Sequence, residues 1–265
     1  MKISRLFWPL LLPVVSGCAS MSAAPDAQVL REIAPTGKLR FGLAFAPEPS
    51  TFFVVKDASG APRGVTAELA ADLARALGRP IEFVLAPNTG ELTEALAAGA
   101  IDAAFMPVDD ERRKRLDIGP VYFVGENTYL VRGDSDIRSI ADVDRREVRV
   151  IGISGTTTIR SAQRTLSQAK VAPVPSVDEA LEMIKSGRAD AFALTHDTLP
   201  TLAPRVPGSR ILDGAFMRVN IAVVLKKNQN AALPFVTRWM DNAKASGAVR
   251  RAFDNAGFKS AAVAP

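Results

Sequence analysis

The residue with the clearest chemical potential in this 265-residue chain is Arg112, which stands in the charged segment D-D-E-R-R-K-R at 109–115. It follows a short apolar run, Ile101–Met106, typical of a strand buried on both faces. Ligands of open parallel sheets bind just beyond the carboxyl ends of the strands. Pro107–Arg112 therefore falls at the mouth of a site, where a guanidinium can grip a carboxylate through two parallel hydrogen bonds. A surface salt-bridge residue is the alternative interpretation of Arg112.

A second candidate is the segment S-G-T-T-T at 154–158, between a predicted strand over 147–153 and a predicted helix over 159–168. A glycine before a helix N-terminus makes a natural anion seat, and threonine is a good N-cap. Thr156 and Thr157 are therefore ligand contacts, helix caps or both. The spacing fits neither a hydrolase nucleophile elbow nor a dinucleotide fingerprint.

The chain has one histidine, His196, and one cysteine, Cys18. A single cysteine excludes an intrachain disulfide, and the two residues form neither a metal cluster nor a nucleophile–base pair. His196 is either a donor to a ligand or a polar loop residue. We expect no cofactor, no metal and no enzymatic activity.

The first residues have the features of a targeting segment. Lys2 and Arg5 precede an apolar run that is too short to span a bilayer, as in a secretory signal. The run ends V-S-G-C at 15–18, which resembles a bacterial lipobox and makes Cys18 the predicted lipid anchor of a periplasmic, membrane-anchored lipoprotein. The alternative is an ordinary signal cut near Ala23–Ala24, which would leave a soluble periplasmic protein.

Composition and element order indicate a globular α/β protein. Hydrophobic residues make up 48% and charged residues 23% of the chain. The formal charge is +5, but the basic residues are scattered, so we expect no nucleic-acid partner. Predicted strands over 38–43 and 81–85 flank a predicted helix over 66–77, and this alternation is typical of a doubly wound sheet.

One unit occurs twice. E-L-T-E-A-L-A-A-G-A-I-D-A at 91–103 is echoed by E-A-L-E-M-I-K-S-G-R-A-D-A at 179–191, and both indicate a helix, a glycine and a strand. Such units are common, so the echo alone leaves open whether the chain has two similar lobes. Asp102 and Asp190 occupy matching positions, and we expect both to be structural.

Six segments in order carry a family resemblance. They are L-R-F-G-L at 39–43, G-V-T-A-E-L-A-A-D-L-A-R-A-L-G at 64–78, the stretch at 91–102, D-D-E-R-R-K-R-L-D-I at 109–118, I-S-G-T-T at 153–157 and S-G-R-A-D-A at 186–191. Over about residues 38–258 the chain resembles the bacterial extracellular solute-binding proteins of the amino-acid class, family 3. The resemblance implies a two-lobed periplasmic-binding-protein type II α/β fold. Each lobe would hold a doubly wound, mainly parallel sheet, and two hinge strands would join the lobes.

The resemblance also implies a division of the chain. The predicted segments are a lipoprotein signal peptide at 1–18, a tether at 19–35, lobe one at 36–124 and 226–258, lobe two at 125–225, and a tail at 259–265. The implied function is that of a monomeric extracytoplasmic binding protein, which captures a small solute between its lobes and delivers it to the permease of an ABC importer.

In the family's terms, Arg112 stands where an arginine clamps the ligand carboxylate. Thr156 and Thr157 stand where a hydroxyl and backbone N–H groups bind. Asn88 and Thr89 occupy the loop where an aromatic residue often covers the ligand. Phe45, near the end of the first predicted strand, lines the site or packs in the core.

The departures concern the ligand's amino group. The family position of the acidic residue that holds an ammonium is Thr195 here, which has no charge, whereas Asp197 lies two residues later. Pro107 stands where a hydroxyl-bearing residue is usual. We therefore expect a small anionic solute, either an organic acid or amino-acid-like. The alternatives are an enzyme on the same fold, similar to the cyclohexadienyl dehydratases, or a sensory or partner-binding periplasmic protein.

Overall fold

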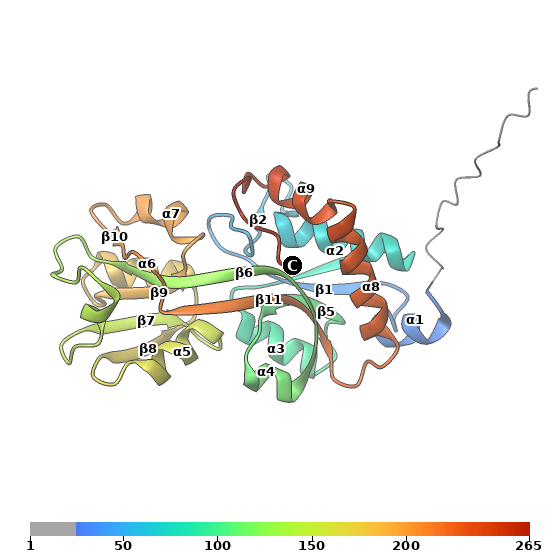
Figure 1. Ribbon diagram of the computed structural model, residues 1–265, viewed down its shortest axis with the longest axis horizontal. Helices are drawn as coiled ribbons and strands as arrows, with labels where there is room; N and C mark the ends of the chain where they lie inside the picture. Colours follow the sequence, from blue (N-terminus) through green and yellow to red (C-terminus); the bar gives the residue numbers. More distant parts are fainter. Residues whose placement is uncertain (1–24) are drawn as a thin grey trace, which may run out of the picture.

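The computed structural model describes residues 25–265, which form two α/β lobes side by side (Figure 1). The two-lobed α/β prediction is confirmed. The signal peptide, the first part of the tether and Cys18 lie outside the described residues. Within residues 25–265, no helix is long and apolar enough to cross a membrane.

Most strands are short, and the two long ones are β6 and β11 in the following list. The strands are β1 (Leu39–Ala44), β2 (Val55–Lys56), β3 (Pro62–Arg63), β4 (Ile81–Ala86), β5 (Ala103–Pro107), β6 (Leu116–Val131), β7 (Arg149–Ile153), β8 (Lys170–Val174), β9 (Ala191–Thr195), β10 (Arg210–Ile211) and β11 (Met217–Lys226).

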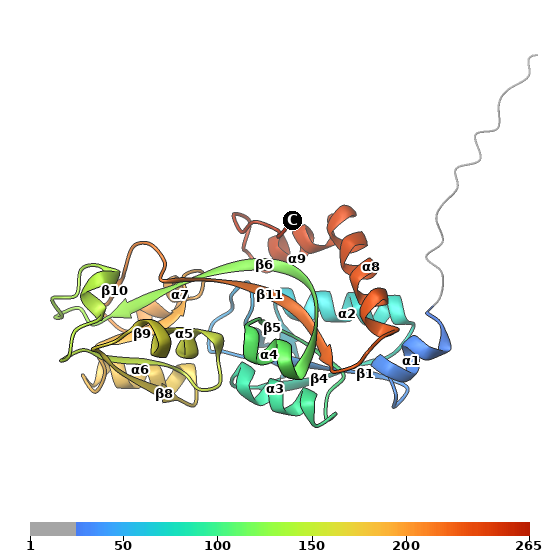
Figure 2. The same cartoon turned by 60° about the horizontal axis from the view of Figure 1, so that its bottom comes forward.

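The helices alternate with strands through most of the chain before it returns to lobe one. They are α1 (Ala27–Ile33), α2 (Val65–Leu77), α3 (Thr89–Ala97), α4 (Asp110–Arg115), α5 (Thr157–Thr165), α6 (Val177–Lys185), α7 (Leu199–Leu202), α8 (Ala232–Ala245) and α9 (Ala248–Asn255), with 3₁₀ turns at Ile140–Val143 and Ala203–Arg205. In both views α8 and α9 lie with lobe one, where they pack on α2 (Figure 2).

One sheet runs through both lobes, in the order β4-β1-β5-β11-β6-β9-β7-β8, with β10 paired to β6. Lobe one holds the parallel strands β4, β1 and β5, and lobe two holds the parallel strands β9, β7 and β8. The antiparallel pair β6 and β11 crosses from one lobe to the other (Figure 1). These two strands correspond to the predicted hinge strands. The division of the chain into lobe one at 36–124 and 226–258 and lobe two at 125–225 stays a prediction.

The repeated unit has the same local structure in each lobe. The Asn88 side chain caps α3 by accepting a hydrogen bond from Glu91 N at 2.9 Å, and Ser176 caps α6 through Glu179 N at 3.2 Å. Gly99 and Gly187 follow the two helices with φ of 72° and 69°, a left-handed conformation that suits glycine.

A clasp between an aspartate and an arginine closes each unit. Asp102 accepts from Arg40 N at 2.9 Å and Arg40 Nε at 3.0 Å. Asp190 accepts from Arg149 N at 2.9 Å and Arg149 Nε at 2.8 Å. Each aspartate therefore ties the start of its own strand to the start of the neighbouring strand, which confirms the predicted structural role.

Candidate functional site

Arg112 lies in α4, the short helix that follows β5. The helix starts because the side chain of Asp109 caps it, accepting from Arg112 N at 3.1 Å. This arrangement directs the arginine inward, and its side chain is among the largest fully buried ones, with 2% of the residue exposed. Its neighbours Arg113, Lys114 and Arg115 are exposed. Because Arg112 itself is buried, its interpretation as a surface salt-bridge residue is wrong.

The guanidinium of Arg112 contacts only neutral oxygen atoms. Nε donates to Thr93 Oγ1 at 3.0 Å, and Nη1 donates to the carbonyl of Pro107. Nη2 donates to Thr89 Oγ1 at 2.7 Å, to Thr89 O at 3.0 Å and to Gly155 O at 3.0 Å. Within residues 25–265 no carboxylate touches this guanidinium, and one N–H of Nη1 has no acceptor. A buried cation in this state is suited to a further anionic partner.

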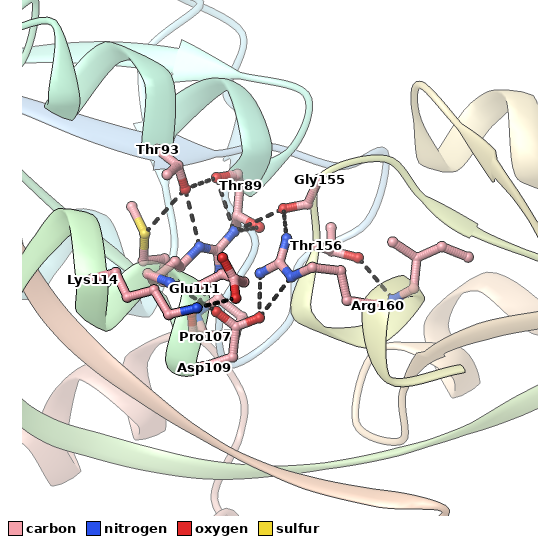
Figure 3. A network of polar contacts seen from close by, with 12 residues as sticks. Thr89, Thr93, Pro107, Asp109, Glu111, Lys114, Gly155, Thr156 and Arg160 are labelled. Atoms are coloured by element: carbon pink, nitrogen blue, oxygen red, sulfur yellow. Dashed lines mark hydrogen bonds and ion pairs between the residues drawn. The ribbon is translucent and has the colours of Figure 1, made fainter. Parts of the chain in front are cut away.

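A second arginine reaches the same point from lobe two (Figure 3). Arg160 of α5 pairs with Asp109 across the lobes, with Nε to Oδ2 at 2.7 Å, and its Nη1 donates to Gly155 O at 3.0 Å. Burial lowers the pKa of Arg112, the positive charge of Arg160 adds to this effect, and Asp109 opposes it. Two guanidinium groups and one carboxylate leave this cluster with a net charge of about +1, which one anion would neutralise.

The N-terminus of α5 meets α3 at this point. A Cβ on Gly155, whose φ is +66°, would stand 2.6 Å from Gly90 Cα, so the two lobes touch here backbone to backbone. Thr156 caps α5 by accepting from Ile159 N at 3.3 Å. The buried hydroxyl of Thr157 has no hydrogen-bond partner among the described residues.

The remaining predicted residues make no hydrogen bond to Arg112. Asn88 donates to Glu91 Oε1 at 3.0 Å and to Pro175 O of lobe two at 3.2 Å, so it links the lobes besides capping α3. Phe45 is half-buried, and its ring lies under the ammonium of Lys56 at 5.2 Å. The contacts that surround Arg112 do not include Phe45.

Thr195 is the last residue of β9, at the corresponding end of lobe two, and Asp197 lies two residues later. The Thr195 hydroxyl pairs with that of Thr198 at 2.7 Å. Asp197 is half-buried and accepts from the backbone N of Thr51 in lobe one at 3.2 Å, and also from the Thr51 hydroxyl. His196 is exposed. The carboxylate of Asp197 therefore faces the opposite lobe, while the neutral Thr195 side chain stays within its own lobe.

The structure thus brings Arg112 and Thr89 into direct contact and joins them through Gly155 to Thr156 and Thr157. Three partners were missed from the sequence: Thr93, Asp109 and Arg160. Asp109 had a usable signal in the sequence, since an aspartate directly before a helix is a good N-cap. Thr93 and Arg160 reach the site only through folding.

Two α/β lobes joined by paired strands, with a buried cation where the lobes touch, define a two-lobed solute-binding protein. The profile of the bacterial extracellular solute-binding proteins, family 3, matches residues 43–256, so the chain belongs to that family. The family is extracytoplasmic and of the amino-acid-binding type.

Relatives of known function point to more than one role. The chain is 27% identical over 206 residues to the glutamine-binding protein of Geobacillus stearothermophilus, covering 76% of this chain and 78% of that protein. It is 27% identical over 236 residues to the membrane-bound lytic murein transglycosylase F of Aeromonas hydrophila, covering 87% of this chain but 44% of that protein.

A solved structure resembles most of the described fold. It is that of AncCDT-1, an ancestral amino acid-binding protein that is a precursor of cyclohexadienyl dehydratase. The TM-score is 0.74 at 28% identity, and the match covers 85% of this chain and 98% of the ancestor.

Proposed function

We propose that this protein captures a small carboxylate between its lobes, outside the cytoplasm, and delivers it to the permease of an ABC importer. The observation that carries the proposal is the buried guanidinium of Arg112, which has only neutral acceptors and keeps one N–H free. A carboxylate held there would offset the cost of burying that charge. The similarity to a glutamine-binding protein supports a ligand of this size and class.

The ligand's second charge depends on Asp197. This carboxylate accepts hydrogen bonds from the backbone N and the hydroxyl of Thr51, and an α-ammonium group could take the place of those two donors. An amino acid would then span from Arg112 to Asp197, whereas an organic acid would leave the Asp197–Thr51 contact in place.

A thermal-shift screen with the twenty L-amino acids and a set of small organic acids tests the proposal, since ligands that bind the native state raise the melting temperature. Arg112→Met should reduce affinity for any hit by about 100-fold or more, because the anion loses its charged partner. Arg113→Met is the matched control, since this neighbour is exposed, and should leave affinity unchanged. A screen without hits, or equal affinity in Arg112→Met, would overturn the proposal.

Asp197→Asn then separates the two ligand classes. Affinity for an amino acid should fall at least about tenfold, because the ammonium loses its counter-charge. Affinity for an organic acid should stay the same or rise.

Membrane anchoring and ligand delivery can be tested separately from ligand binding. We infer a monomer tethered through Cys18, so radiolabelled palmitate should label the wild type and not Cys18→Ser. Cells that lack the protein should lose uptake of the identified ligand, and unchanged uptake would favour a sensory or partner-binding role.

Catalysis is the second candidate, favoured by the likeness to a precursor of cyclohexadienyl dehydratase. Elimination chemistry needs an acid–base group poised at the substrate. His196 is exposed and Asp197 is engaged by Thr51, so we infer binding without turnover. Product formation from prephenate or arogenate by the purified protein, lost in Asp197→Asn, would replace the transport proposal.

A further inference from the structure

A buried amide in lobe two is not used by any contact described so far. Asn127 lies in the crossing strand β6, opposite Thr195 of β9 and Met217 of β11, and it is 0% exposed. Thr195 is the last residue of its strand, so Asn127 stands at the end of the lobe-two sheet that meets lobe one. An amide at this buried position needs hydrogen-bond partners for both its oxygen and its nitrogen.

Only half of that amide is satisfied. Asn127 Oδ1 accepts from Thr158 Oγ1 at 3.1 Å, which fixes the amide against the first turn of α5. Its Nδ2 has no acceptor among residues 25–265, and neither does the hydroxyl of Thr157, the preceding residue of the same turn. A buried polar group without a partner is destabilising, so two of them, one in β6 and one in the first turn of α5, call for an explanation.

The position of this turn connects it to the anion site. Gly155, two residues before Thr157, accepts a hydrogen bond from Arg112 through its carbonyl oxygen. Thr157 and the buried guanidinium therefore border the same contact between the lobes, and Asn127 is joined to this turn through Thr158. A ligand held by Arg112 would lie next to the first turn of α5.

We propose that Asn127 is a specificity-determining residue that donates from Nδ2 to an uncharged oxygen of the ligand, with Thr157 as a second contact. The proposal rests on the carboxylate-binding function above. An amide nitrogen only donates, so the ligand atom must be an acceptor. Thr158, which donates to this amide, and Thr195, its cross-strand partner, are neutral and would not balance a second carboxylate. The ligand class is therefore a carboxylic acid with a hydroxyl, carbonyl or amide oxygen.

Matched ligand pairs test this inference by titration calorimetry. L-lactate is compared with propanoate, and L-glutamine with L-norvaline, because each pair differs mainly in the extra oxygen-bearing group. The wild type should prefer the oxygen-bearing member of at least one pair by about tenfold or more, as expected for one hydrogen bond to a buried donor. Asn127→Leu should bind both members of that pair within about twofold of each other.

Controls separate this role from a structural one. Thr128→Val removes a buried hydrogen bond, from Thr128 Oγ1 to Leu212 O at 2.8 Å, on the opposite face of the same strand. It should lower stability and keep the ligand preference. If Asn127→Leu does not fold, Asn127→Asp serves instead, since it keeps the oxygen that accepts from Thr158 and replaces the donor.

The outcomes are distinct. An unchanged preference in the Asn127 variant, or equal binding of both members of both pairs by the wild type, overturns the Asn127 inference while Arg112-dependent carboxylate binding stands. If the wild type binds no carboxylate at all, both proposals fall.

Discussion

The two copies of the helix–glycine–strand unit, α3–β5 in lobe one and α6–β9 in lobe two, are alike at one end and different at the other. Both have a side-chain N-cap, a left-handed glycine and an aspartate clasped by the arginine of a neighbouring strand. Beyond β5, lobe one continues into α4 with the buried cation Arg112, whereas in lobe two β9 ends at Thr195 and the chain continues to the anion Asp197. The shared half builds each lobe, and the ends that are not shared are the ones that we propose select the ligand.

The largest expected difference between the two ends is in ligand affinity. Arg112→Lys keeps the charge but loses the planar fork, and we expect affinity for the identified carboxylate to fall about 100-fold. Thr195→Val keeps the shape and removes a hydroxyl that is bonded to Thr198, so affinity should change by about threefold or less. Calorimetric titration measures both. Equal losses would mean that the two ends contribute alike.

The next test uses two glycines of the lobe-one unit. A Cβ at Gly90 would lie 2.9 Å from Gly155 Cα and 3.2 Å from Ser154 O, so Gly90→Ala should hold the lobes apart and weaken binding about tenfold. Gly99→Ala places a side chain at a φ of +72° and should lower stability by about 1 kcal/mol without changing affinity. Full affinity in Gly90→Ala would show that ligand binding does not need this contact.

The clasps allow a stability comparison. The side chain of Asp102 is 3% exposed and that of Asp190 is 16% exposed. Removing one partner of a more buried pair costs more, so we expect Asp102→Asn to lower the free energy of unfolding by about 3 kcal/mol and Asp190→Asn by about 1 kcal/mol. Urea denaturation measures both values. The reverse order would mean that burial does not set the strength of the clasp.

The smallest effect concerns pH. Burial acts to raise the pKa of Asp190, but hydrogen bonds from Arg149 outweigh it, so the pKa in the folded protein lies below the ordinary value. The charged clasp therefore stabilises the fold at pH values above about 4, the ordinary carboxyl pKa, and this contribution is lost as the pH falls through the lower folded value. The stability gap between the wild type and Asp190→Asn should narrow below about pH 4. A constant gap would contradict the charge-based account.

Much of the fold could be predicted because its signals are local. The glycine stop and the apolar strand of each unit follow from a few adjacent residues, and the structure has both. The crossing strand β6 was harder to predict over its full length, from Leu116 to Val131. Gly119 and Pro120 favour a loop locally, and pairing with β11 overrides that preference.

The site could be predicted only in part. Arg112 was found through its spacing after a strand and through the family resemblance. Thr93 and Arg160 were missed because they are 19 and 48 positions away and gain their role through packing. Asn127 was missed because nothing in G-E-N-T-Y indicates that its amide is buried against the first turn of α5.

The single sheet has a consequence for solubility. Since β6 and β11 join the two lobes into one ladder, the path of strands has two terminal members, β4 and β8, where two separate sheets would have four. The edge strand β8 carries Lys170 and Pro173, the latter opposite Gly152. A proline offers no N–H to an approaching strand, and burying the charge of an edge lysine is unfavourable. This edge is therefore poorly suited to pairing with a second molecule.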